Sequence, residues 1–175
     1  MVIETPRLIL REMEDGDFAA LRRVLGDRHN MRFYPYVFDD ARIRAWITSN
    51  IERYSTFGFG LWAVCMKDGG ELIGDCGLTM QNINGVILPE IGYHMRGDMQ
   101  RNGYAREAAS AVRDWAFRVT PFRRLFSYMP AAHVASAATA RSIGMELANR
   151  YIDSSSGIET LVYEVCKSDK AEHVA

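Results

Sequence analysis

The segment from Val86 to Met129 constrains the fold of this chain more than any other. "VILPEIGYHM" reads as a strand, "RGDMQRNG" as a polar loop, and "RRLFSYM" as a second strand after an intervening helix. The helix is indicated by apolar residues at three- and four-residue spacing over 105–119, and Pro121 ends it. A strand–helix–strand unit joins two parallel strands through a right-handed crossover. We therefore expect one parallel pair, with the polar loop at the carboxyl end of its first strand, where open α/β sheets bind ligands.

The rest of the chain predicts antiparallel strands and three more helices around this unit, an α+β arrangement. Strand-like runs lie at 7–12, 59–66, 71–80, 145–152 and 158–165, and helix-like runs at 15–27, 39–58 and 134–143. The turn sequences "KDGG" and "SSSG" predict hairpins between neighbouring strands. No repeat or linker interrupts the pattern, so we expect a single domain over residues 1–167 and a frayed tail over 168–175.

Composition excludes several classes of function. A net charge of -1 without a polybasic run gives no reason to expect nucleic acid as a partner. No apolar run approaches the roughly 20 residues of a membrane span, and the charged start does not resemble a signal peptide. The three cysteines, Cys65, Cys76 and Cys166, lack the paired spacing of a zinc site or a disulfide framework. We expect a cytoplasmic protein with reduced thiols and no metal.

The polar loop has the chemistry of an anion site. The first N–H groups of a helix lack intrahelical partners, and the helix dipole adds positive charge there. Gly103 has no Cβ, so a phosphate could approach its backbone closely, and Arg101 and Arg106 could add charge-assisted contacts. The alternative is that Gly103 only permits a turn. The loop is neither a Walker A motif nor G-x-G-x-x-G.

The pattern Gln100-x-x-Gly103-x-Ala105 after "EIGYHM" resembles the acetyl-CoA signature of the Gcn5-related N-acetyltransferase (GNAT) family. The stretches "ETPRLILREMEDGDF", "FGLWAV", "LIGDCGL" and "HVASAATARSIGM" resemble the branch that acetylates ribosomal-protein N-termini, the RimJ/RimL-like enzymes. The resemblance covers about residues 3–165. It implies a mixed, mostly antiparallel sheet of seven strands with helices on both faces. It also implies a splayed parallel pair that admits acetyl-CoA, and transfer of an acetyl group to an amine.

The resemblance also implies where the cofactor binds. Main-chain amides of Ile91, Tyr93 and Met95 would pair with the pantetheine arm, as one strand pairs with another. The pyrophosphate would lie on a loop made of Gln100, Arg101, Asn102, Gly103, Tyr104, Ala105 and Arg106. Near the arm, relatives often carry Asn-x-x-Ser, whereas this chain has His133 and Ser136. His133 differs in shape from Asn, which leaves its contact with the arm open.

The chemistry needs a base, because an alkyl amine with a pKa near ~10.4 is mostly protonated at neutral pH. Glu90 is the first candidate, and His94, which alternation places on the same face of the strand, is the competing one. Each could instead be an ordinary strand side chain. Ser136 could hydrogen-bond the sulfur or cap its helix. Tyr128 could act as the acid or belong to the core.

The acceptor pocket is expected around "MRFYPYVF", the hairpin at Gly157 and the strand with Trp62. Phe33, Tyr34 and Tyr36 are the expected contacts, although these rings could equally support the helices. The acceptor would be a small-molecule amine or a protein N-terminus, and a homodimer is left open. A cysteine that first takes the acetyl group is disfavoured, because no histidine lies near Cys76 in the sequence. The alternative function is a non-catalytic acyl-CoA-binding sensor or scaffold.

Overall fold

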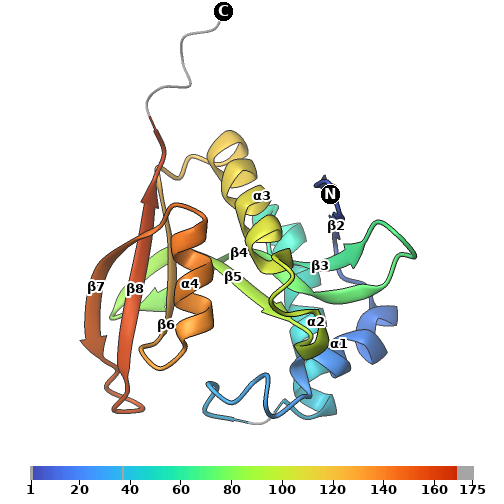
Figure 1. Ribbon diagram of the computed structural model, residues 1–175, viewed down its shortest axis with the longest axis horizontal. Helices are drawn as coiled ribbons and strands as arrows, with labels where there is room; N and C mark the ends of the chain where they lie inside the picture. Colours follow the sequence, from blue (N-terminus) through green and yellow to red (C-terminus); the bar gives the residue numbers. More distant parts are fainter. Residues whose placement is uncertain (1, 37, 169–175) are drawn as a thin grey trace, which may run out of the picture.

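The computed structural model describes residues 2–36 and 38–168, whose strands form one sheet of eight in the order β1-β2-β3-β4-β5-β6-β8-β7 (Figure 1). The strands are β1 (Val2–Glu4), β2 (Leu8–Arg11), β3 (Leu61–Met66), β4 (Leu72–Ile83), β5 (Val86–Met95), β6 (Arg124–Pro130), β7 (Glu146–Ile152) and β8 (Glu159–Cys166). The helices are α1 (Phe18–Leu25), α2 (Asp40–Phe57), α3 (Tyr104–Val119) and α4 (Val134–Ser142), with 3-10 turns η1 (Asp15–Asp17) and η2 (Gly97–Met99). Apart from Ser168, the tail predicted to fray lies outside the described residues.

The expected mixed, mostly antiparallel sheet is confirmed, but it has one more strand than the seven expected. The additional strand is β1, which pairs antiparallel with β2 in the register Val2 with Arg11. Thr5 makes the tight turn between them, since its hydroxyl accepts from the N–H of Leu8 at 2.9 Å. Three residues are too short to show an alternating pattern, which is why the sequence did not reveal this strand.

The crossover predicted over residues 86–129 is present. β5 and β6 are the parallel pair of the sheet, and α3 connects them. The other neighbouring strands pair antiparallel, so this pair is where the sheet reverses its pattern. A topological reversal of this kind leaves a gap at the carboxyl ends of the strands, where a ligand can enter.

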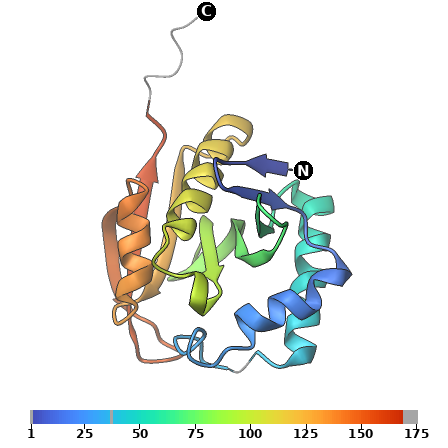
Figure 2. The ribbon, with the colours of Figure 1, turned by 45° about the vertical axis from the view of Figure 1, so that its right-hand side comes forward.

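Helices cover both faces of the sheet, as the family resemblance implies. Along β3, Trp62 and Val64 face a core cluster with α3 and α4, whereas Leu61 and Ala63 face a cluster with α1 and α2. This alternation follows from the two-residue period of a strand. Figure 2 shows α1 and α2 on one side of the sheet, away from α3 and α4. None of the described helices combines the length and hydropathy needed to cross a membrane.

The ends of α2 show how the local sequence sets an element. Asp39 is the N-cap, and its carboxylate accepts from the N–H of Arg42 at 2.8 Å. Gly58 ends the helix at φ 76°, a left-handed conformation that a residue without Cβ adopts at little cost. These caps set the two ends of α2. Its Trp46 and Tyr54 pack against a core cluster that also holds Met31 and Phe38 from the aromatic loop, residues 31–36 and 38.

Trp62 is a central side chain of the core and provides a stability test. It is fully buried, and its ring packs edge to face on Trp115 with centroids 4.9 Å apart. We expect Trp62→Ala to lower the free energy of unfolding by about 3–5 kcal/mol, because it leaves a large cavity. Urea unfolding followed by circular dichroism measures this.

A Trp62→Phe variant is the matched comparison. The indole Nε1 of Trp62 has no hydrogen-bond partner among the described residues, so phenylalanine also removes an unpaired buried donor. It should therefore cost clearly less than alanine. Equal losses for the two variants would contradict a packing role for the ring.

Candidate active site

The parallel strands β5 and β6 separate soon after they meet. In the described part of the chain they share a single register pair, Glu90 with Phe126. Just beyond it, Ser127 Oγ donates to the carbonyl of Ile91 at 2.7 Å. Main-chain groups alternate along a strand, so the N–H and carbonyl of Tyr93 point to the same side as those of Ile91. The gap therefore has a strand edge able to pair with an extended amide-containing chain.

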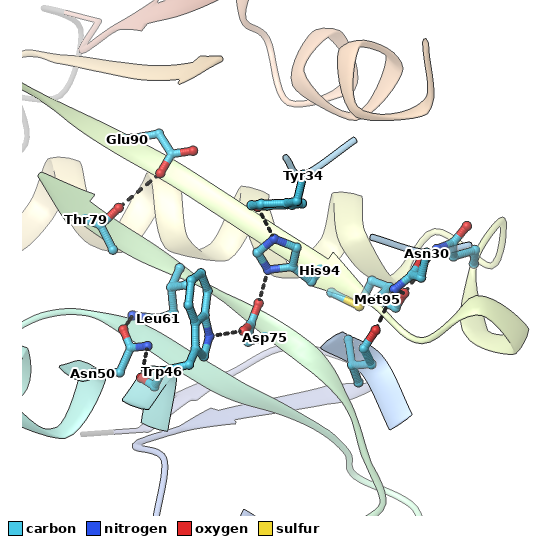
Figure 3. Close-up of polar contacts among 12 residues, drawn as sticks. Asn30, Tyr34, Trp46, Asn50, Leu61, Asp75, Thr79, Glu90, His94 and Met95 are labelled. Carbon is cyan, nitrogen blue, oxygen red and sulfur yellow. Dashed lines mark hydrogen bonds and ion pairs between the residues drawn. The ribbon is translucent and has the colours of Figure 1, made fainter. Parts of the chain in front are cut away.

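The end of β5 is closed by two amide side chains. The carbonyl of Met95 accepts from Asn30 Nδ2 at 2.9 Å and from Gln100 Nε2 at 3.1 Å (Figure 3). Gln100 also donates to Asn30 Oδ1, and Asn30 donates to the carbonyl of Val24 at 3.1 Å. Gln100, predicted as a phosphate-loop residue, thus uses its side chain to tie the loop to β5 and to the segment after α1.

The loop between β5 and α3 presents its backbone outward. Arg101 has φ 63° and Gly103 has φ 81°, and Gly103 is the N-cap of α3. Within the described chain, no hydrogen bond uses the main-chain N–H of any residue from 101 to 106. Arg101 and Arg106 are exposed, and neither makes an ion pair with a described residue. Consecutive free N–H groups at a helix N-terminus beside two cations form a site for phosphate oxygens.

Arg7 clamps the outer side of this loop. Its Nη1 donates to the carbonyl of Asn102 at 3.0 Å, and its Nε donates to Glu107 at 2.7 Å. The guanidinium also lies over the ring of Tyr104, 4.5 Å from the centroid. Burial opposes ionisation of Glu107, but its hydrogen bonds to Thr5 and Arg7 prevail and lower its pKa. The loop is therefore held in shape before any ligand binds.

Glu90 lies on β5 next to the gap. Its Oε2 accepts from Thr79 Oγ1 at 3.0 Å, because the register of β4 and β5 pairs these two residues (Figure 3). The side chain is half-buried. Burial raises the pKa of Glu90 to about 7, although the Thr79 hydrogen bond acts in the opposite direction. A carboxylate with this pKa can accept a proton from an amine at neutral pH.

His94 lies on the same face of β5 in a chain of hydrogen bonds. Its Nδ1 is 2.6 Å from Asp75 Oδ1, and its Nε2 is 2.5 Å from the hydroxyl of Tyr34 (Figure 3). Trp46 Nε1 donates to the other oxygen of Asp75 at 2.9 Å. Burial lowers the pKa of His94, but the Asp75 carboxylate outweighs it, so the pKa is raised. His94 is thus not the exposed strand histidine that was the alternative.

The aromatic loop before α2 reaches across the gap to α4. Phe33 stacks on His133 with ring centroids 4.1 Å apart. The Arg32 guanidinium also lies over the Phe33 ring, 4.6 Å from its centroid. Tyr34 is turned inward to His94, whereas Tyr36 is largely exposed. The structure therefore brings Phe33 and Tyr34 to the two sides of the gap, as expected for residues near an acceptor. Their contact with an acceptor stays a prediction.

His133 is the N-cap of α4, so Ser136 does not cap that helix. His133 Nδ1 accepts from the N–H of Ser136 at 3.4 Å. Burial and the nearby Arg32 lower the pKa of His133 to about 4, so the ring is neutral and can accept this bond. Ser136 Oγ lies 3.3 Å from the hydroxyl of Tyr93, which itself donates to the Ser136 carbonyl at 2.9 Å.

The structure corrects the expectation for Trp62 and places Tyr128. Trp62 is fully buried among α3 side chains, so it has no surface on which an acceptor could rest. Its strand alternates, and the sequence did not show which face is nearer the gap. Tyr128 is half-buried beside Phe126 and Tyr151, on a small cluster separate from the main core. Burial, with a contribution from Glu90, raises its pKa to about 12, so it stays protonated.

The cysteines offer no paired nucleophile. Cys65 and Cys76 are buried and Cys166 is exposed. Burial raises the pKa of Cys76, which keeps it as an inert thiol. We expect a variant with all three replaced by alanine to retain turnover within about threefold, if direct transfer holds. The measurement is free CoA release, with mass spectrometry of the wild-type protein during turnover. A stoichiometric acetyl-cysteine that forms and decays at the catalytic rate would contradict direct transfer.

Several site residues were not found from the sequence. They are Arg7, Asn30, Trp46, Asp75 and Thr79. Asp75 and Thr79 lie in "GDCGLT", where two polar residues four positions apart, on one face of an otherwise apolar strand, were the available signal. Among the described residues, no group of His, Cys, Asp and Glu is arranged to hold a metal ion.

Residues 7–146 match the family described as acetyltransferase (GNAT) domain. The chain is 35% identical over 142 residues to the uncharacterized protein YkkB of Bacillus subtilis (strain 168), covering 81% of this chain and 83% of that protein. The match of residues 7–146 takes in both β5 and the loop to α3.

Two solved structures show the same fold. An acetyltransferase from Agrobacterium tumefaciens str. C58 superposes with a TM-score of 0.82 at 27% identity, covering 95% of each chain. RimL, a ribosomal L7/L12 alpha-N-protein acetyltransferase solved in complex with coenzyme A, superposes with a TM-score of 0.77, covering 95% of this chain and 98% of that one. Its identity is 19%, so this second likeness is one of fold.

Proposed function

This chain belongs to the GNAT family of acetyltransferases, and on that premise we propose that it moves an acetyl group directly from acetyl-CoA to a primary amine. The observation that carries the proposal is that an anion site and a base are arranged along β5 and the loop that follows it. The row of free N–H groups at 101–106 follows the end of β5, and Glu90 lies earlier on that strand beside the gap. A pyrophosphate on the row would direct the rest of the cofactor along the strand toward Glu90.

The residues present fit acetyl-CoA. Gly103 carries no side chain, and Arg101 and Arg106 are free to pair with phosphates. The pantetheine amides would pair with main-chain groups of Tyr93, whereas the Ile91 carbonyl already accepts from Ser127 and the Met95 carbonyl from Asn30 and Gln100. Acetyl-CoA supplies the activated thioester. The protein supplies position, a base and hydrogen-bond donors for the oxyanion.

Transfer follows from these roles. Glu90 removes a proton from the ammonium, and the neutral amine attacks the thioester carbon. A nitrogen–carbon bond forms, the carbon–sulfur bond breaks, and the thiolate leaves with the electron pair. Ser136 and Tyr93 lie together on the α4 side of the gap, where a hydroxyl could donate to that sulfur. Direct attack needs no covalent enzyme intermediate, in agreement with the unpaired cysteines.

The acceptor is a small-molecule amine or a protein N-terminus. RimL is a ribosomal L7/L12 alpha-N-protein acetyltransferase. Its likeness to this chain is the reason for including protein N-termini among the acceptors to be tested. The sensor alternative depended on the altered segment at His133. Since His133 caps α4 and leaves that helix intact, it gives no reason to expect loss of turnover.

An acceptor screen tests the proposal. The protein is mixed with acetyl-CoA and a panel of amines that includes peptides with free N-termini, polyamines, amino acids and aminoglycosides, and free CoA is followed with a thiol reagent. Calorimetry with acetyl-CoA alone measures binding independently. Amine-dependent CoA release supports the proposal. Binding without release from any amine would favour the sensor, and no binding would overturn both.

A further inference from the structure

Four side chains behind the gap form a directed chain of hydrogen bonds. The chain runs from Tyr34 in the aromatic loop to His94 on β5, then to Asp75 on β4 and Trp46 on α2 (Figure 3). These segments are distant in sequence and meet only in the fold. Figure 3 shows Tyr34 and Glu90 on the same side of β5, and Asp75 on the opposite side of His94 from Tyr34.

The donors and acceptors fix the direction of this chain. An indole N–H only donates and a carboxylate only accepts, so Trp46 Nε1 must donate to Asp75. Asp75 then accepts from His94, which places the proton of a neutral imidazole on Nδ1. His94 Nε2 is left as an acceptor, so the hydroxyl of Tyr34 donates to it. The arrangement leaves His94 ready to take one more proton through Tyr34.

The surroundings favour that proton. Asp75 is fully buried and the His94 side chain is 11% exposed, so their attraction is little screened by water. The titratable groups facing His94 are Asp75 from β4, Glu90 from its own strand and Tyr34 from the loop, with His133 at the start of α4. Of these, the Asp75 carboxylate stabilises an imidazolium, Glu90 adds to this only while it is ionised, and neutral His133 does not oppose it.

Two protons must leave the nitrogen during the reaction. An ammonium nitrogen carries three protons and the amide nitrogen that it becomes carries one, so two must leave. Glu90 can hold one of them. The second is lost after attack, when the new nitrogen–carbon bond makes the nitrogen cationic and strongly acidic.

We propose that Tyr34 and His94 receive this second proton, with Asp75 and Trp46 as positioning residues. The inference rests on the proposed function. The nitrogen proton passes to the Tyr34 oxygen as the phenolic proton passes to His94 Nε2, so Tyr34 ends neutral and His94 becomes an imidazolium paired with Asp75. The imidazolium later returns its proton by the same path, to solvent or to the departing thiolate.

The test combines turnover with a measurement that needs none. Tyr34→Phe removes the hydroxyl and keeps the ring, and Asp75→Asn keeps the shape and removes the charge. We expect each to lower kcat by about 10–10²-fold, with KM for acetyl-CoA little changed. This loss of kcat relative to wild type should become smaller above pH 9. Tyr54→Phe, which deletes a half-buried hydrogen-bonded phenol on α2, is the matched control and should leave the shape of the pH profile unchanged.

Nitrogen NMR of His94 in the ligand-free protein provides the independent readout. Wild type should show the Nδ1–H tautomer and a pKa above 6.5, and Asp75→Asn should lower that pKa because the neighbouring charge is gone. An Nε2–H tautomer in wild type, or a Tyr34→Phe variant within threefold of wild type at every pH, would overturn the inference. Absence of acetyl transfer by wild type to any amine would instead be a failure of the proposed function, and the NMR result would still stand.

Discussion

Glu90→Gln should lower turnover by about 10²–10⁴-fold, the usual contribution of a positioned general base, while affinity for acetyl-CoA stays near wild type. Glutamine keeps the size of the side chain and can still accept from Thr79, so the change removes only the proton acceptor. Glu90 lies away from the phosphate loop, which is why binding should be spared. The measurement is a pH–rate profile at saturating acceptor, with acetyl-CoA affinity from calorimetry.

The pH dependence has a definite sign. With the pKa of Glu90 at about 7, wild-type turnover should fall as the pH drops below 7, because the carboxylate becomes protonated. Glu90→Gln should lose this limb and keep rising toward the pKa of the amine. Thr79→Val is the matched control: it leaves the carboxyl group but removes a hydrogen bond that lowers its pKa, so the acidic limb should move to higher pH.

The same pKa makes Glu90 a cost to stability at high pH. The folded-state value is raised above 4.5, so between pH 4.5 and about 7 the folded protein binds more protons than the unfolded chain, and stability falls as pH rises. Glu90→Gln should therefore unfold at a higher temperature than wild type at pH 8.

A Glu90→Gln protein that keeps its turnover and the acidic limb of its pH profile would assign Glu90 a structural role and leave His94 as the base.

Gly103→Glu should weaken acetyl-CoA binding by more than about 10²-fold, because it blocks hydrogen bonds to charged phosphates and adds a like charge beside them. At φ 81° the new side chain is also strained. Its Cβ would meet Arg7 Nη2 at 3.4 Å, an ordinary contact, so the fold should survive. Calorimetry with acetyl-CoA measures the affinity.

Two controls separate the effects. Gly85→Glu introduces the same residue at φ 84° in open space at the other end of β5, and should leave affinity unchanged. Gly103→Ala carries the strain and the Cβ without the charge, and should fall between wild type and Gly103→Glu. Unchanged affinity in a folded Gly103→Glu protein would remove the loop from the cofactor site.

Most of the fold could be predicted from local patterns. The crossover at 86–129 followed from a strand, a polar loop and an apolar stripe, and helix caps such as Asp39 and Gly58 were visible as residue types. Strand β1, which the sequence did not predict, is too short to show an alternating pattern, and it forms by pairing with β2. Periodicity identifies an element, but a pairing partner outside the element decides whether a short edge strand forms.

The site was harder to predict because the partners of its β5 side chains are set by the register between β4 and β5. Glu90 and His94 were visible on one face of a strand, but their partners Thr79 and Asp75 lie opposite them on β4 and become neighbours only through the ladder. The spacing of Asp75 and Thr79 placed them on one face of a strand, but it did not show that Asp75 lies opposite His94. Phe33 and His133 lie 100 positions apart in sequence, and no local pattern relates them.

The free N–H row at 101–106 belongs to the main chain, which every residue type except proline provides equally. Main-chain donors place no demand on the side chains that carry them, so in a saturation mutagenesis of the loop we expect a residue whose side chain neither reaches another segment nor pairs with phosphates, such as Asn102, to accept many replacements, with proline as the recurrent exception. The proposed acceptor contacts of Phe33 and Tyr34 depend on side chains, so we expect no such tolerance there. We therefore expect substitutions at Phe33 and Tyr34 to change which amine is used, and most substitutions at Asn102 to spare acetyl-CoA binding.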